Sequence, residues 1–451
     1  MTLPAAPRFL RATATARRFA GARNNVQRWR SPDPGEVASF QLDRLRAVWA
    51  DVVKNVPYYQ RLVANGAAPR AIESLTQFRS GVPLLRREDV IAAPELFVRT
   101  DRFPDAFMTT AGSTGNPLRF GVYRQESEPP ASDMLTARIA NGLEEGDRVF
   151  LLWGHSHLLG TGLRGLGKHG VRTIKDWVLG YRRANAYRLD PSSARSHMHA
   201  ILSFRPHVLI AYSNALDLLV RHNHELRADA RALGLRFVVA TAEVLPSPDT
   251  RLIVEDFFGC PLAMEYGGVE FAAVAHTDSD GLYRVYWWNV LVEAVVESAA
   301  EETQIAVTAL YPRCFPIVRY LPGDELGGVH RLPEGSVIAF DEMRGRHNDV
   351  VRLEDGTVIH SVALFHSIHQ EPGVYNIQLV LEPGTIRIVL VAADRDPARL
   401  ARIRHRLRSL SPALAAAPIE VVADLVTNRA GKRRWIVDRR GENTPAVRGP
   451  A

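Results

Sequence analysis

The segment Met108–Arg119, MTTAGSTGNPLR, constrains this chain more than any other stretch of its sequence. Its first half, from Thr109 to Gly115, contains no side chain larger than threonine. Glycine tolerates positive φ angles and lets an anion approach the backbone closely. Such a loop can therefore wrap its N–H groups and hydroxyls around a polyphosphate, although a plain Gly/Ser turn has the same composition. It is not a Walker loop, because no Gly-Lys-Ser/Thr follows.

Four further motifs follow this loop in order: Glu265–Glu270 (EYGGVE), Arg319–Asp324 (RYLPGD), Gly345–Asp349 (GRHND) and Asn428–Arg434 (NRAGKRR). Three of the four also have an ordinary explanation when taken singly. Tyr-Gly-Gly beside a strand is often a turn, Pro-Gly-Asp is a common β-turn, and a terminal GKRR is usually a solvated basic patch. The functional interpretation therefore depends on the order and spacing of the five segments.

Together the five segments resemble the ordered signature of the adenylate-forming (ANL) superfamily: a TSGSTGxP-type loop, YGxTE, Y-x-TGD, GRxxD and a terminal GK. The stretch LDRLRAVWADVVKNVPYYQRLVANG, followed by PLLRREDV, resembles the phenylacetate–CoA ligase and capsule-biosynthesis (CapK-like) branch. The resemblance spans residues 38–440. It implies a Mg·ATP-dependent ligase that converts a carboxylic acid, an aromatic one in this branch, into an acyl-adenylate, releases pyrophosphate and transfers the acyl group to CoA.

The resemblance also implies a role for each motif. Adenylation requires that phosphate charge is neutralised and that the acid oxygen is aligned with the phosphorus. Tyr266 would lie against the adenine, Asp324 would accept hydrogen bonds from the ribose hydroxyls, and Glu270 would bind Mg²⁺ as a catalytic residue. Arg346 would reach the nucleotide, and Lys432 would be the catalytic charge at the α-phosphate. Four loop residues would cradle the β- and γ-phosphates: Thr110, Ser113, Thr114 and Gly115.

The chain departs from the family pattern at several motif positions, and these departures put the speed and the substrate of the reaction in doubt more than the fold. The loop lacks the usual lysine, the second motif has valine for threonine, the third has proline for threonine, and the fourth has an unusual hinge residue. The residues at these positions are Asn116 and Leu118, Val269, Pro322, and Asn348.

Periodicity predicts an α/β fold in two parts. Apolar residues at helical spacing predict a helix that ends near Asn55, before Pro57. From residue 105 to 340, β-rich runs such as VFLLW, HVLIAY and LRFVVAT alternate with helical stretches, which predicts a large layered α/β domain with parallel sheet. After GRHND, β-rich runs surround a helix from Pro397 to Leu410, which predicts a small mobile α+β domain.

We place the domain boundary near Met343–Gly345, where a connector between two bodies would act as a hinge. The predicted divisions are a basic N-terminal arm (1–35), an adenylate-forming domain with the ATP and acyl pockets (36–344), and a C-terminal lid domain with the catalytic lysine (345–451). The arm carries seven arginines before the first acidic residue, Asp33. We interpret it as a frayed arm or surface helix; a targeting segment, a membrane-surface helix or a partner contact remains an alternative.

Cysteine content, apolar runs and net charge restrict the cellular location and the ligands that we expect. Two cysteines, Cys260 and Cys314, cannot form a disulfide framework or a cysteine zinc site, which favours a reducing cytoplasm. The apolar runs fall far short of the ~20 residues that a membrane span needs. A net charge of +7 is compatible with ATP or CoA as ligands. We expect a small-molecule acid as substrate, no nucleic-acid partner and no transmembrane segment, and homodimer formation stays open.

Two other patterns compete with this interpretation. The glycine-rich stretch Gly160–Gly165 and the near-Walker run Gly162–His169 match nucleotide motifs, but neither begins a clean βαβ unit. We expect this stretch to line the acyl pocket, as its place in the related branch suggests. Three His-x-His pairs lack a third ligand at a recognisable spacing, so no metal site is predicted there. Transfer to an amine or hydroxyl, or a catalytically degenerate nucleotide-binding protein, are the alternative functions.

Overall fold

The computed structural model describes most of the chain, and every structural statement below concerns these residues. They are residues 6–109, 118–153, 162–186, 188–189, 191–242, 245, 249–296, 303–344, 350–353, 356–360, 364, 368, 371, 373–422, 436–438 and 440. Among them, the side chains of residues 162–170, 188–189, 191, 214, 344, 350–352, 358, 360, 375–376 and 438 are not described.

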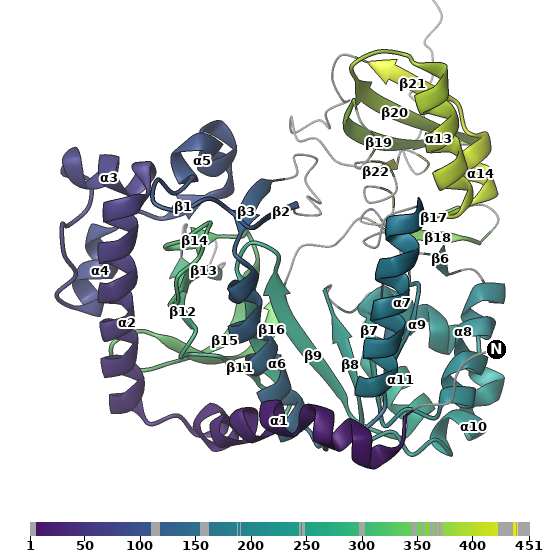
Figure 1. The fold of residues 1–451 in the computed structure, drawn as a ribbon, viewed down its shortest axis with the longest axis horizontal. Helices are drawn as coiled ribbons and strands as arrows, with labels where there is room; N and C mark the ends of the chain where they lie inside the picture. Colours follow the sequence, from purple (N-terminus) through teal and green to yellow (C-terminus); the bar gives the residue numbers. More distant parts are fainter. Residues whose placement is uncertain are drawn as a thin grey trace, which may run out of the picture.

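A parallel half-sheet forms one side of the large N-terminal part. Strand β4 (Val149–Leu152) pairs with β5 (Tyr181–Ala184) and β7 (Val208–Tyr212), β7 with β8 (Phe237–Thr241), and β8 with β9 (Leu262–Gly268), all in parallel. Because both faces of a parallel sheet are covered by helices, the inner strands β4, β7 and β8 consist mostly of buried apolar residues. They match the β-rich runs expected from the sequence, and the predicted α/β class is confirmed (Figure 1).

Beyond β9 the same sheet becomes antiparallel, apart from the parallel pair of strands at its far edge. Strand β9 pairs with β10, which continues through β11, β16, β15 and β13. Because it joins the two halves, β9 places the EYGG segment at the centre of a thirteen-stranded sheet. The remaining strands of this sheet are β1 (Leu85–Arg86), β10 (Ala272–Thr277), β11 (Tyr283–Val285), β12 (Val290–Val296), β13 (Thr303–Ala309), β14 (Tyr320–Leu321), β15 (Glu325–Arg331) and β16 (Val337–Arg344).

Helices cover the sheet and form its N-terminal flank. The expected helix stop is confirmed, because α2 (Pro34–Asn55) ends at Asn55 and α3 (Pro57–Ala64) begins at the proline. Asp33 caps α2 by accepting a 2.8 Å hydrogen bond from the Glu36 N–H. The other helices of this part are α4 (Leu75–Gly81), α5 (Arg87–Ala92), α6 (Glu128–Ala140), α7 (Gly162–Leu179), α8 (Pro191–Phe204), α9 (Ser213–Arg221), α10 (Arg227–Arg231) and α11 (Thr250–Phe258).

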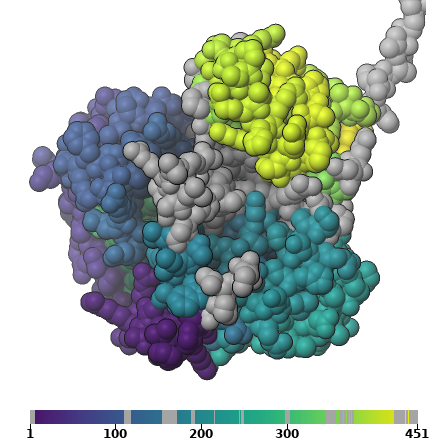
Figure 2. All heavy atoms as spheres, turned by 45° about the vertical axis from the view of Figure 1, so that its right-hand side comes forward, coloured from purple at the N-terminus to yellow at the C-terminus, as the bar shows by residue number. Residues whose placement is uncertain are grey.

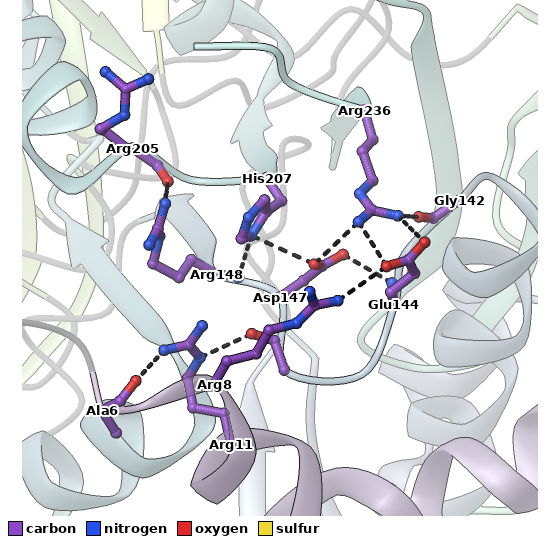
Figure 3. Close-up of polar contacts among 11 residues, drawn as sticks. Ala6, Arg8, Arg11, Gly142, Glu144, Asp147, Arg148, Arg205, His207 and Arg236 are labelled. Carbon is purple, nitrogen blue, oxygen red and sulfur yellow. Dashed lines mark hydrogen bonds and ion pairs between the residues drawn. The ribbon is translucent and has the colours of Figure 1, made fainter.

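The arginine-rich N-terminal segment forms helix α1 (Arg8–Arg30), which lies along the base of the molecule in Figure 1. One side of α1 is buried, and Trp29 stacks on Tyr286 at 6.1 Å between ring centroids. Several of its arginines contact the turn that follows α6: Arg8 pairs with Glu144 at 3.2 Å, and the Arg11 Nε donates to the Gly146 carbonyl at 2.8 Å (Figure 3). These contacts fix α1 to the domain.

The α6–β4 turn is itself held by a charged cluster, shown in Figure 3. Glu144 also pairs with Arg236 at 2.6 Å, and these arginines lower the Glu144 pKa to about 2. The His207 Nδ1 accepts the Arg148 backbone N–H at 2.8 Å. Burial lowers the pKa of His207, with Arg148 acting in the same direction and Asp147 opposing it, so the ring stays neutral.

The C-terminal unit has its own sheet and core. Strands pair in the order β21 (Ile419–Val422), β20 (Thr385–Ala392), β19 (Val374–Glu382) and β22 (Ile436–Asp438), with α13 (Pro397–Arg408) and α14 (Pro412–Ala416) packed beside them. In Figure 2 this unit is a separate lobe. The expected boundary segment, residues 345–349, lies outside the described residues.

A small sheet links the two parts of the chain. Strand β18 (Val358–His360) pairs with β17 (Val350–Arg352) on one side and with β6 (Arg188–Leu189), a strand of the N-terminal part, on the other. Among the described residues, no helix is both long and apolar enough to cross a membrane.

Candidate functional site

The structure brings together two residues that the sequence predicts as nucleotide-binding. The Tyr266 hydroxyl, near the end of β9, donates a hydrogen bond to the Asp324 Oδ2 at 2.9 Å. Both residues are partly exposed. The Tyr266 ring is held against Phe271 and Phe340, with centroid separations of 6.0 Å and 6.4 Å. An aromatic face and a carboxylate therefore lie side by side, an arrangement suited to a base and a vicinal diol.

The RYLPGD motif is held in place by its first residue. The Arg319 guanidinium donates two hydrogen bonds to the Glu293 carboxylate, at 3.1 Å and 3.0 Å, and the pair is buried. Arg319 also adopts a positive φ of 52°, and its carbonyl accepts the Leu85 N–H at 2.9 Å. Gly323, at φ 85°, then turns the chain so that Asp324 precedes β15. The motif pattern alone predicts no role for Arg319, whereas in the structure its guanidinium holds the segment that leads to Asp324.

The glycines of EYGGVE are required by close packing, against backbone at Gly267 and against an aromatic ring at Gly268. A side chain on Gly267 would place its Cβ 2.4 Å from the Ala272 carbonyl oxygen, and one on Gly268 would meet the Phe271 ring at 2.5 Å. The backbone of β10 therefore approaches β9 too closely for a side chain at Gly267. Ala272 itself is strained, with a φ angle of 61°. These glycines shape the tight turn that carries Glu270.

Glu270 lies in this turn and is only 9% exposed. Its Oε1 accepts a 2.7 Å hydrogen bond from the Arg87 Nη1, and the Arg313 Nη1 donates to its backbone carbonyl at 2.6 Å. Arg87 lies in the PLLRREDV stretch, whose pattern alone does not predict a functional role for it. A buried arginine paired with a motif glutamate becomes visible only once the fold brings α5 beside β9.

The residues present fit a Mg²⁺ ion held chiefly by nucleotide phosphates. Mg²⁺ commonly takes one or two protein carboxylates and completes its shell with phosphate and water oxygens. Glu270 supplies one such carboxylate at the turn, although Arg87 contacts one of its oxygens. Within the described part of the chain, no group of three or more His, Cys, Asp or Glu side chains is arranged to hold a metal by itself. A single-carboxylate site is therefore the arrangement to test.

The predicted phosphate loop connects the two strands of one hairpin. Strands β2 (Ala106–Thr109) and β3 (Arg119–Val122) pair antiparallel, with Thr109 opposite Arg119, so the two ends of the loop are neighbours. On β3, Phe120 packs against Phe315 at 5.0 Å between centroids, next to Arg313, which holds the Glu270 turn. The hairpin and the Glu270 turn are thus joined through one short segment.

The positions at which the sequence differs from the family motifs lie in different surroundings. Leu118 is 3% exposed and belongs to the core, so its side chain packs inward from the end of the loop. Pro322 is buried, whereas Val269 is 37% exposed beside Glu270. The remaining predicted site residues lie outside the described residues: Thr110, Ser113, Thr114, Gly115, Asn116, Arg346, Asn348 and Lys432.

A buried ion pair supports the strand that carries Tyr266. Arg138 on α6 contacts the Glu265 Oε1 through Nε at 2.8 Å and Nη2 at 2.6 Å. Beside them, the His276 Nδ1 lies 2.6 Å from the Thr277 carbonyl oxygen, which can only accept, so this nitrogen carries the proton. Burial lowers the pKa of His276 against the opposing effect of Glu265, and the ring stays neutral. This group locks α6 to β9.

Comparison with known proteins places this fold beside that of a CoA ligase. No protein-family model matches the chain, and no curated protein matches it. Solved structures of a 2-hydroxyisobutyryl-CoA ligase do match. The structure with 2-HIB-AMP and CoA in the thioesterification state has a TM-score of 0.58, 18% identity and 92% coverage of both chains. The postadenylation-state structure with R3-HIB-AMP has a TM-score of 0.55, 16% identity and 91% coverage of both chains. At these identities the likeness shows a shared fold.

Proposed function

We propose that this chain is a Mg·ATP-dependent ligase that activates a carboxylic acid as an acyl-adenylate, releases pyrophosphate and transfers the acyl group to CoA. The observation that carries this proposal is the contact between Tyr266 and Asp324. Two motifs far apart in sequence supply an aromatic ring and a diol acceptor at one place, in a fold shared with a ligase that binds 2-HIB-AMP and CoA.

Each side chain then has a task in adenylation. Tyr266 lies against the adenine, and Asp324 accepts hydrogen bonds from the ribose hydroxyls. The hydroxyls and N–H groups of Thr110, Ser113, Thr114 and Gly115 hold the β- and γ-phosphates. Glu270 orients Mg²⁺, which when bound neutralises charge on the phosphate oxygens.

Two cations come from the chain that follows β16. Arg346 reaches the nucleotide from the segment between the two units, and Lys432 approaches the α-phosphate as the acid oxygen attacks it. Pyrophosphate leaves on the opposite side, so both cations stabilise charge that grows along the reaction. The C-terminal unit then changes orientation so that CoA can reach the acyl-adenylate. The CoA thiol attacks the acyl carbonyl and forms the thioester, and AMP leaves.

We infer the substrate class from the phenylacetate–CoA ligase and CapK-like branch that the N-terminal sequence resembles. This favours an aromatic acid, with the glycine-rich stretch around Gly160–Gly165 lining the acyl pocket. CoA is favoured as acceptor over an amine or hydroxyl by the CoA-bound ligase that shares the fold. Cys260 and Cys314 are both buried free thiols, in keeping with the proposed cytoplasmic location.

Acid-dependent exchange of labelled pyrophosphate into ATP tests the proposal directly. A panel with phenylacetate, benzoate, other aryl acids and 2-hydroxyisobutyrate should identify at least one acid that stimulates exchange. Adding CoA to the enzyme with ATP and the stimulating acid should then form a thioester. Formation of an amide or ester with an amine or hydroxyl compound instead would identify that compound class as the acyl acceptor. A complete absence of exchange over the panel, with ATP bound, would indicate a nucleotide-binding protein without turnover.

A further inference from the structure

Arg87 is placed by the strand that precedes it. Strand β1 pairs in parallel with β14, so that Leu85 lies opposite Tyr320 and Arg86 opposite Leu321. Arg87 follows directly at the start of α5, next to the RYLPGD motif and opposite the β9–β10 turn. The backbone here is fixed independently of the Arg87 side chain, because the Arg86 N–H donates to the Asp89 carboxylate at 2.9 Å.

The Arg87 guanidinium lies against the carboxylate that the proposed function assigns to Mg²⁺. Its Nη1 is 2.7 Å from the Glu270 Oε1, and the two side chains are 7% and 12% exposed. Water therefore screens this pair weakly, and the guanidinium neutralises most of the charge that Glu270 would present to another cation. Arg313 donates to the Glu270 carbonyl rather than to its carboxylate, so Arg87 is the arginine that contacts the group in question.

A divalent cation at Glu270 would lie close to the guanidinium, and like charges in a poorly screened site repel. We propose that Arg87 and the divalent cation compete for the Glu270 carboxylate, so that Arg87 sets the divalent-cation affinity of the nucleotide site. This inference rests on the proposed role of Glu270. Arg87 is argued to act through Glu270, and it is therefore a positioning residue.

Charge and shape can be separated by substitution. Arg87→Gln removes the positive charge and keeps a polar side chain that can still donate to Glu270. Arg87→Lys keeps the charge and loses the planar fork. Arg86→Gln is the matched control, because Arg86 is the exposed neighbour and its loss changes the net charge equally.

Mn²⁺ is titrated against each purified full-length variant that holds one equivalent of a non-hydrolysable ATP analogue. The EPR signal of free Mn²⁺ then reports the affinity of the nucleotide site without turnover. Competition predicts that Arg87→Gln binds Mn²⁺ at least threefold more tightly than the unsubstituted protein. Arg87→Lys and Arg86→Gln should stay within twofold. The double variant with Glu270→Gln should lose the gain.

Unchanged or weaker Mn²⁺ binding in Arg87→Gln would overturn the competition, and weaker binding in both Arg87 variants would make Arg87 an orienting group instead. If Glu270→Gln alone binds Mn²⁺ normally, Glu270 is not the ligand and the inference fails. Pyrophosphate exchange by the unsubstituted protein still decides the proposed function separately. Cooperative thermal unfolding checks each variant, and Arg87→Met replaces the glutamine variant, with the same expectation, if the latter does not fold.

Discussion

The Tyr266 hydroxyl and the Asp324 carboxylate are joined by a 2.9 Å hydrogen bond that spans 58 positions of sequence. Neither residue can move without disturbing the other, because Tyr266 is packed between aromatic rings and Asp324 follows the anchored Arg319. The proposed adenine and ribose contacts therefore form one rigid unit, and their substitutions should have related effects.

We expect Tyr266→Phe to raise the KM for ATP about fivefold with little change in kcat. The ring that faces the adenine is retained, while Asp324 loses a partner worth about 1 kcal/mol. Asp324→Ala should raise the same KM further, since ribose contacts bind the ground state and the transition state about equally. Steady-state kinetics at varied ATP check this. A fall in kcat at unchanged KM in both variants would remove these residues from the ribose site.

Asp133 should make the protein less stable as the pH rises. It is buried on α6 and accepts hydrogen bonds from the Trp288 indole and the Asn289 amide at 2.8 Å and 2.7 Å. Burial raises its pKa from 3.8 to about 7, against the effect of these hydrogen bonds. The native state then binds a proton that the unfolded state releases above pH 3.8, so stability falls between that pH and about 7.

The loss of stability caused by Asp133 is proportional to the interval between its pKa values in the unfolded and native states. At ~1.4 kcal/mol per pH unit, the loss approaches about 4 kcal/mol. Urea unfolding of the wild type and of Asp133→Asn at pH 5 and pH 8 measures it, because asparagine cannot ionise. Only the part of the window from pH 5 to about pH 7 lies in this range, so the wild type should lose about 3 kcal/mol more than the variant. Parallel pH profiles for the two proteins would show that Asp133 is already ionised in the native state.

The sequence predicted the parts of this protein that depend on local pattern. The β-rich runs became β4, β7 and β8, and the stop at Asn55 was correct because Pro57 cannot continue the preceding helix. The partners of the motif residues could not be predicted. Arg87 meets Glu270 across 183 positions, and this contact depends on the register of β1 against β14.

The N-terminal segment shows a second limit. A run of arginines without acidic residues is compatible with a free arm, a membrane-surface helix or a docked helix, since composition alone does not say where the counter-charges lie. Here they lie on the turn after α6, where Glu144 and Glu145 pair with Arg8 and Arg23. The pairing depends on tertiary structure, and no periodicity in the segment encodes it.

Lys432→Ala should leave folding and ATP binding nearly intact and reduce adenylate formation by two to three orders of magnitude. A positive charge aimed at the reacting phosphate typically contributes about 3–4 kcal/mol of barrier stabilisation, by analogy with the loss of an oxyanion-hole donor. Acid-dependent pyrophosphate exchange measures this step. Transfer to CoA from a presynthesised acyl-adenylate serves as the control and should survive. Near-normal exchange in the variant would exclude Lys432 from adenylation.

Asn348→Pro should separate the two half-reactions. The segment Gly345–Asp349 joins the N-terminal part, whose last strand β16 ends at Arg344, to the chain that leads into the second core. If the C-terminal unit adopts one orientation for adenylation and another for transfer, residues in this connector must change φ and ψ between them. Proline fixes φ near −65° and removes a backbone donor, so only one orientation should accept it. The two half-reactions are measured separately. Pyrophosphate exchange reports adenylation, and thioester formation from presynthesised acyl-adenylate reports transfer. We expect one rate to fall at least tenfold more than the other, with Asn348→Ala as the control that preserves both. Equal losses would place the pivot elsewhere in the chain, because a restricted hinge cannot slow two orientations alike unless both require the same backbone angle.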